Sequence, residues 1–229
     1  MKSLFFRLIR LIWGLFLFAL GVVFTINAHI GYAPWEVFHV GIAKTMGISI
    51  GFAVIIVGIA IVLLTILLGE KFGLGTIINM VLIGVFLDMI LASQLIPVAD
   101  KFELGLFMLV IGLFIISFAS YFYIGAGLGA GPRDSLMVAL TRKTSLPIGI
   151  CRGGLEVLVV LIGWQMGGML GIGTVLAAVL VGFCIQITFR LLRFDATQVK
   201  HETLIQSYHA LFNSKRGSQS AEHEVTESE

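Results

Sequence analysis

The sequence predicts an all-α membrane protein with six transmembrane helices and two shorter helices. Three observations lead to this prediction. The chain is 58% hydrophobic and 12% charged with a mean hydropathy of +1.04, which is too apolar for a soluble domain of 229 residues. Six apolar segments are long enough to cross a bilayer. Finally, residues 10–91 align with residues 108–189 without a gap, which divides the spans into two groups of three.

The internal repeat depends on residues that shared apolar composition does not explain. At a constant displacement of 98 positions, 21 of the 82 aligned pairs are identical, and these include seven glycines and a proline. Each copy contains an odd number of predicted spans, so the second copy is expected to lie inverted relative to the first. Inverted repeats of this kind are typical of secondary transporters.

The six spans are predicted from the lengths of the apolar segments, because a bilayer core of ~30 Å requires ~20 helical residues. They fall at residues 8–28, 51–68, 75–95, 104–124, 149–166 and 173–192. The first span begins close to Lys2, Arg7 and Arg10 and so resembles a signal peptide. No cleavage site of small residues follows it, and the fourth span matches it in the repeat, so it is predicted to belong to the fold.

Lysine and arginine are distributed unequally between the two predicted faces. With the N-terminus inside, thirteen of these residues lie on or near the cytoplasmic side, and only Lys44 and Lys101 lie on the outer side. This bias predicts six spans with both termini in the cytoplasm. Counting residues 34–45 and 132–143 as full spans would give eight helices and parallel copies. Helices of about 13 residues reach only ~20 Å, however, which is too short.

The segments after the first and fourth spans each contain glycines, then a proline, then an acid two residues later. Pro34 with Glu36 and Pro132 with Asp134 suit the first turn of a helix, where a negative charge complements the helix dipole. We predict short broken or re-entrant helices that begin near these prolines and enter from opposite sides. Their N-terminal ends are expected to lie close to a shared cavity.

Four blocks resemble the YczE family of bacterial integral membrane proteins, which is related to the YitT-type proteins. They are Gly31-x-x-Pro34-Trp35-Glu36-x-x-His39, Gly73-x-Gly75-Thr76, Gly127-x-Gly129-x-Gly131-Pro132-Arg133-Asp134 and Gly171-x-Gly173-Thr174. The resemblance covers roughly residues 10–190 and implies a six-helix, multi-pass protein of the bacterial inner membrane. It implies no substrate, so the expected site must come from the residues themselves.

Polar residues within the apolar segments define the expected site, because an intramembrane charge normally faces a partner or a water-filled cavity. Asp88 lies in the third span, Gln186 is its repeat partner, and Glu156 lies in the fifth span. The candidates for binding a solute or protons are Trp35, Glu36, His39, Asp88, Arg133, Asp134, Glu156 and Gln186. Plainer roles stay open: Arg152 and Glu156 can form a local ion pair, and Glu36 and Asp134 can serve only the helix ends.

Two classes of function fit these features. The first is a small secondary transporter or permease for an anionic or zwitterionic solute. The alternative is a non-transporting membrane accessory or sensor protein. Enzymatic activity is not expected, since the sequence contains no nucleophile–base pair, zinc motif or nucleotide loop. We expect no cofactor, no metal and no nucleic-acid partner. The expected contacts are the lipid bilayer and an unidentified small solute, and a homo-oligomer or a membrane partner stays open.

The C-terminal tail is predicted to be separate from the transmembrane domain. The domain comprises residues 1–196, and the tail comprises residues 197–229. An apolar stripe from Leu204 to Phe212 is expected to form an amphipathic helix, and the polar sequence from Asn213 onward is expected to be disordered. Cys151 and Cys184 lie in apolar segments and are expected to be buried free thiols.

Overall fold

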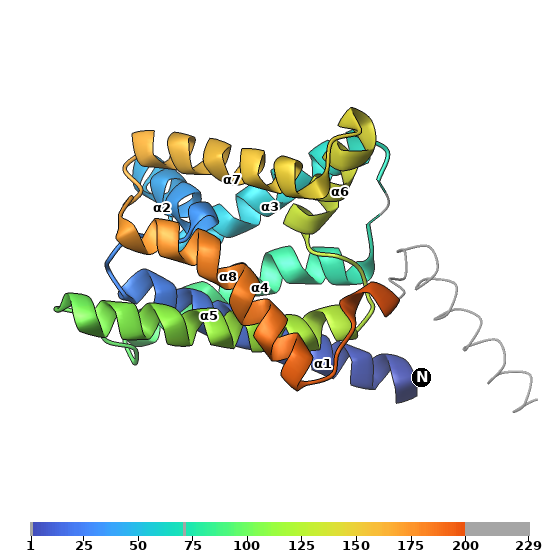
Figure 1. Cartoon of the computed structure of the whole chain (residues 1–229), viewed down its shortest axis with the longest axis horizontal. Helices are drawn as coiled ribbons and strands as arrows, with labels where there is room; N and C mark the ends of the chain where they lie inside the picture. Colours follow the sequence, from blue (N-terminus) through green and yellow to red (C-terminus); the bar gives the residue numbers. More distant parts are fainter. Residues whose placement is uncertain (1, 71, 200–229) are drawn as a thin grey trace, which may run out of the picture.

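The computed structural model describes residues 2–70 and 72–199, and this part of the chain contains eight α-helices and one short 3₁₀ helix (Figure 1). The helices are α1 (Lys2–Asn27), α2 (Pro34–Met46), α3 (Ile50–Leu67), α4 (Leu74–Ser93), α5 (Phe102–Gly125), α6 (Pro132–Thr144), α7 (Ile148–Gln165) and α8 (Ile172–Leu191), followed by η1 (Ala196–Gln198). The amphipathic and disordered segments predicted for the tail lie outside the described residues.

Six of these helices are long and apolar enough to cross a membrane, namely α1, α3, α4, α5, α7 and α8. Their bounds agree with the predicted spans to within two residues, except that α1 begins at Lys2 rather than near residue 8. The charged residues ahead of the first apolar run therefore continue the helix. The two shorter helices begin at Pro34 and Pro132, as predicted, and each contains 13 residues.

The long helices α1 and α5 run side by side in opposite directions along the lower part of Figure 1. They approach closely at Gly21 and Gly112, where a Cβ added to either residue would lie 2.8 Å from the carbonyl oxygen of the other. Small residues permit this backbone approach between membrane helices. Helix α4 packs on α1, and α8 packs on α5.

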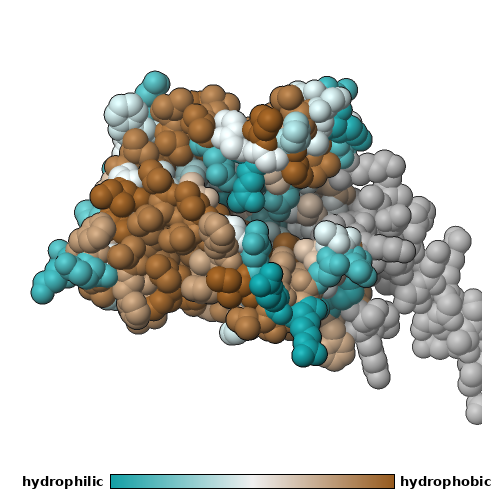
Figure 2. All heavy atoms as spheres, in the orientation of Figure 1, coloured by the Kyte–Doolittle hydropathy of each residue, from teal (hydrophilic) through white to brown (hydrophobic). Residues whose placement is uncertain are grey.

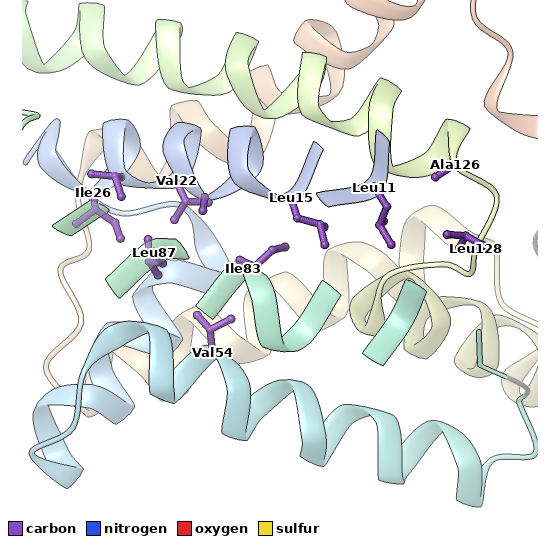
Figure 3. Close-up of a cluster of buried hydrophobic side chains, with 11 residues drawn as sticks. Leu11, Leu15, Val22, Ile26, Val54, Ile83, Leu87, Ala126 and Leu128 are labelled. Atoms are coloured by element: carbon purple, nitrogen blue, oxygen red, sulfur yellow. The ribbon is translucent and has the colours of Figure 1, made fainter. Parts of the chain in front are cut away.

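A core of buried apolar side chains fills the space between α1, α4 and α3 (Figure 3). Leu15 and Val22 of α1 point toward Ile83 and Leu87 of α4, and Val54 contributes from α3. The outer surface is also largely apolar, and Figure 2 shows broad hydrophobic areas over the helices. Exposed Leu, Ile, Val and Phe side chains on such a scale suit a lipid environment better than water.

Two inter-helix connections hold the short-helix loops in place by reciprocal hydrogen bonds. The Gly75 N–H donates to the Leu128 carbonyl (2.7 Å), and the Gly173 N–H donates to the Ile30 carbonyl (2.8 Å). The two bonds correspond to each other, because Gly173 lies 98 positions after Gly75 and Ile30 lies 98 positions before Leu128. The bounds of α2, α3 and α4 likewise recur 98 positions later in α6, α7 and α8.

The Gly-x-Gly-Thr turns start α4 and α8. The Thr76 hydroxyl accepts from the Gly73 N–H (3.3 Å), and the Thr174 hydroxyl accepts from the Gly171 N–H (3.2 Å). The preceding helices α3 and α7 are followed by Gly69 and Gly167, whose φ angles of 84° and 90° favour glycine. These sequences are therefore tight helical connections.

Candidate functional site

A cavity of about 230 Å³ lies between the two halves of the chain. Of its 30 lining residues, 26 fall into 13 pairs whose members are 98 positions apart. The N-terminal turns of α2 and α6 form one such set of pairs, from Ala33 with Gly131 to His39 with Met137. The expectation that both proline-initiated helices begin beside a shared cavity is thus confirmed.

Helices α2 and α6 begin with nearly the same backbone geometry. The residues before the prolines, Ala33 and Gly131, have φ/ψ values of −62°/155° and −61°/157°, and neither provides a side-chain cap. Proline fits the first helical position because the missing N–H has no intrahelical acceptor there. Two uncapped helix N-termini therefore bring positive dipole ends to the cavity wall, each accompanied by an acid in its first turn, Glu36 or Asp134.

Arg133 joins the two short helices. Its Nη2 atom lies 3.7 Å from Glu36 Oε1 and 3.4 Å from His39 Nδ1, and its Cζ atom lies 4.6 Å from the centroid of the Trp35 ring. Trp35 and Arg133 are themselves a pair 98 positions apart. The predicted shared face of Glu36 and His39 is thus the face that contacts α6.

These contacts define the hydrogen-bonding state of His39. A guanidinium has donors and no acceptor, so His39 Nδ1 accepts from Arg133 and its proton resides on Nε2. Glu36 and His39 are only 7% and 1% exposed, whereas the Arg133 side chain is 31% exposed. The cation therefore bridges a buried polar pair and the open space of the cavity, where it can also reach a solute.

A second polar group lies on α7. Arg152 Nε donates to Glu156 Oε1 at 2.9 Å, as expected for a local pair four residues apart, and both residues also line the cavity. The structure adds three polar lining residues that the sequence reasoning missed: Asn79, Ser120 and Tyr123. The signal for Asn79 was an uncharged polar side chain within an otherwise apolar span, which attention to charged residues alone overlooks.

Asp88 and Gln186 do not line the cavity, contrary to the expectation of a central Asp88. On α4 the cavity face carries Asn79, Met80 and Ile83, and a position five residues beyond Ile83 is rotated by about 140° from it at 3.6 residues per turn. Asp88 instead faces α3, where its carboxylate accepts from the Ser49 hydroxyl and from the Gly51 N–H (2.7 Å). Gln186 is exposed on α8. Within the described residues, no group of three His, Cys, Asp or Glu could hold a metal ion.

The described polar contacts therefore centre on the meeting point of two helix N-termini. Comparison with known proteins places the chain in a family. A family described as "Family of unknown function (DUF6198)" matches residues 5–190. The chain belongs to this family.

Two relatives match most of the chain. It is 37% identical over 175 residues to the "Uncharacterized membrane protein YczE" of Bacillus subtilis, covering 76% of this chain and 80% of the relative. It is 35% identical over 176 residues to an "Uncharacterized protein" of Haemophilus influenzae, covering 77% and 80%. No solved structure matches the chain significantly. The resemblance to YczE seen in the sequence is confirmed, and the chain is a multi-pass membrane protein.

Proposed function

We propose that this protein is a small secondary transporter whose cavity binds a small anionic or zwitterionic solute. The observation that carries the proposal is the composition of the cavity wall. It combines 13 residue pairs displaced by 98 positions with two uncapped helix N-termini and charged side chains of both signs. A polar site between repeated halves, formed by broken helices, is the arrangement on which alternating access depends.

The proposed topology has two inverted repeats and both termini in the cytoplasm. Three features support it: the opposite directions of α1 and α5, the reciprocal hydrogen bonds of the two loops, and the location of α2 and α6 toward opposite ends of the molecule (Figure 1). Because Arg133 and Arg152 both line the cavity, the lysine and arginine bias becomes eleven against two, which still favours a cytoplasmic N-terminus.

The charged groups suggest how a zwitterion would be held. Arg133 and the two helix N-termini favour a carboxylate or phosphate group of the solute. Glu156 and Asp134, which line the same cavity, favour an ammonium group. Apolar side chains such as Val57 and Ile61 form much of the remaining wall, so the solute would carry an apolar portion of modest size.

The test is uptake into liposomes that contain the purified full-length protein. We would use labelled alanine and glutamate as amino-acid probes and labelled lactate and succinate as carboxylate probes, with and without an imposed proton gradient. Accumulation or counterflow of at least one probe in protein-containing liposomes, and not in empty ones, is the expected result. The conservative variant Arg133→Lys should reduce the uptake, because lysine retains the charge but lacks the guanidinium that lies over the Trp35 ring.

Absence of uptake and of counterflow for every probe, with protein shown to be folded and inserted, would overturn the transporter proposal. That outcome would favour the accessory or sensor protein instead.

A further inference from the structure

The helix pairs α3–α4 and α7–α8 occupy corresponding places in the two halves, but they pack differently. Helices α3 and α4 are in close contact: a Cβ on Gly51 would collide with the Gly84 carbonyl oxygen, and a Cβ on Gly84 with that of Gly51. Adding 98 to these positions gives Gly149 of α7 and Gly182 of α8. A Cβ on either of these would meet no heavy atom within 4 Å among the described residues.

The α7–α8 pair, called the open pair below, faces a hollow in the molecular surface. Helix α7 packs on α2 and α6, and α8 packs on α5, whereas α7 and α8 do not form a packed pair within the described chain. Figure 2 shows hydrophilic residues within a hollow between the α7 layer and the layer that contains α8. Arg152 and Glu156 of α7 and Ala178 of α8 line the cavity, and the two helices do not pack against each other beside it.

The α3–α4 pair, called the closed pair below, is held by a polar contact that the α7–α8 pair lacks. Asp88 of α4 accepts from the Ser49 hydroxyl and the Gly51 N–H at the first turn of α3. Positions 98 residues later carry Gln186 in place of Asp88 and Pro147 in place of Ser49. Proline has no hydroxyl, so the equivalent of the Ser49 bond cannot form between α7 and α8. An amide is a weaker acceptor than a carboxylate, so the equivalent of the Gly51 bond would be weaker.

We propose that α3–α4 and α7–α8 are two gates of the cavity, that Asp88 latches the α3–α4 gate, and that the α7–α8 gate closes by packing Gly149 against Gly182. This inference rests on the proposed transport function and adds its mechanism of access. The structure is then one of two states, with the α3–α4 gate shut and the α7–α8 gate open. In the proposed topology the open gate lies at the cytoplasmic end.

Glycine at these positions is the physical basis of the proposal. Gly51 and Gly84 are required because the closed helices bring backbone against backbone. Gly149 and Gly182 experience no such restriction in the open state. A closed state with the same helix register gives them the same restriction. Any larger side chain at Gly182 would therefore fit the open state and block the closed one.

The experiment uses matched cysteine pairs at the gates in a full-length background with Cys151→Ala and Cys184→Ala. One variant carries Pro147→Cys with Gln186→Cys across α7–α8, and the other carries Ser49→Cys with Asp88→Cys across α3–α4. After oxidation in native membranes, unreacted thiols are counted by denaturation and labelling with a polyethylene-glycol maleimide. Both cysteine pairs should form disulfides. The 147–186 pair can do so only when the α7–α8 gate closes transiently.

Gly182→Leu then tests whether closure depends on glycine. It should abolish the disulfide between positions 147 and 186 and leave the disulfide between positions 49 and 88 intact, which also shows that the variant is folded. Val179→Leu, on an exposed position of the same helix, is the matched control and should change neither disulfide.

Two results would overturn the gate proposal. One is failure of the 147–186 pair to oxidise in membranes where the 49–88 pair does. The other is a 147–186 yield that Gly182→Leu leaves unchanged. Neither measurement requires a solute, so failed uptake would remove the transport function without deciding the gates, and failed cross-linking would remove the gates without deciding transport.

Discussion

Helices α3 and α7 have bounds 98 positions apart but present different chemistry to the cavity. Along the cavity wall, α3 carries Val54, Val57 and Gly58, whereas α7 carries Arg152, Leu155 and Glu156 at the corresponding positions. The apolar helix belongs to the tightly packed pair, and the charged helix belongs to the open one. The two helices therefore share their bounds under a displacement of 98, while α3 gives the cavity an apolar wall and α7 gives it a charged one.

The largest expected effect concerns the orientation of the two halves. We expect the position after Lys101 to lie outside the cytoplasm and the position after Lys143 to lie inside it, because inverted halves place them on opposite sides of the membrane. A reporter that is active only outside should therefore work at the first position, and a reporter that is active only inside should work at the second. Alkaline phosphatase and green fluorescent protein fusions at both positions provide the measurement. The same side for both fusions would contradict the inverted arrangement and favour parallel copies instead.

The next largest effect separates the two arginines. Arg133→Ala should lower the free energy of unfolding by about 3 kcal/mol, because it leaves the buried Glu36 carboxylate without its cation. Arg152→Ala should cost under about 0.5 kcal/mol, since its pair with Glu156 is a partly exposed contact along one helix. Thermal unfolding of both variants in the same detergent measures the difference. Equal losses would show that Arg133 does not hold the short helices together.

A glycine comparison tests the packed and open pairs directly. Gly51→Ala should destabilise the protein by about 1–3 kcal/mol, because the new methyl group collides with the Gly84 carbonyl. Gly149→Ala should be neutral or should stabilise by up to about 1 kcal/mol, since the site is empty and alanine favours helix. Melting temperatures of the two variants decide between these outcomes. A strongly destabilised Gly149→Ala would indicate that α7 and α8 are already packed.

The sequence predicts the helices well because each depends on local features. Apolar length gives the spans, and Pro34 and Pro132 give the starts of the short helices. The shared cavity face of Glu36 and His39 follows from their spacing of three. The location of Asp88 does not follow from the sequence, because a charged residue in a span can face either the cavity or a neighbouring helix. The packing of α4 on α3 determines that Asp88 faces α3.

The openness of the α7–α8 pair is also beyond sequence reasoning. Gly51 and Gly149 occupy equivalent positions in equivalent helices, and glycine permits close packing without requiring it. The difference arises from tertiary contacts, among them the Asp88 latch and the attachment of α7 to α2 through Gly163, which lies against the Phe38 backbone.

A smaller effect distinguishes Asp88 from its repeat partner. Asp88→Asn should weaken the contact with Ser49 and Gly51, at a cost of about 1 kcal/mol, because an amide oxygen accepts less strongly than a carboxylate. Gln186→Asn should have no measurable effect, because Gln186 is exposed. Labelling of an introduced Ala178→Cys by an impermeant maleimide from the outer side should increase only in the Asp88 variant. Unchanged labelling would remove Asp88 as a latch.

A small effect on stability is also expected from Glu156, and it sharpens the contrast between the α3 wall and the α7 wall of the cavity. Glu156→Gln should change the free energy of unfolding by only about 0.3–0.5 kcal/mol, because a pair four residues apart along a helix contributes little. Its effect on uptake should be larger than its effect on stability if the carboxylate contacts a cationic group of the solute from the charged wall.

The control for Glu156→Gln is a change on the apolar wall. Gly58→Ala is unsuitable, since a Cβ there would lie 2.7 Å from Met80 Cβ, so Val57→Ile serves instead. Uptake that falls with Glu156→Gln and persists with Val57→Ile would assign solute binding to α7. If both variants retained the same uptake, recognition of the charge of the solute would be confined to Arg133 and the short helices.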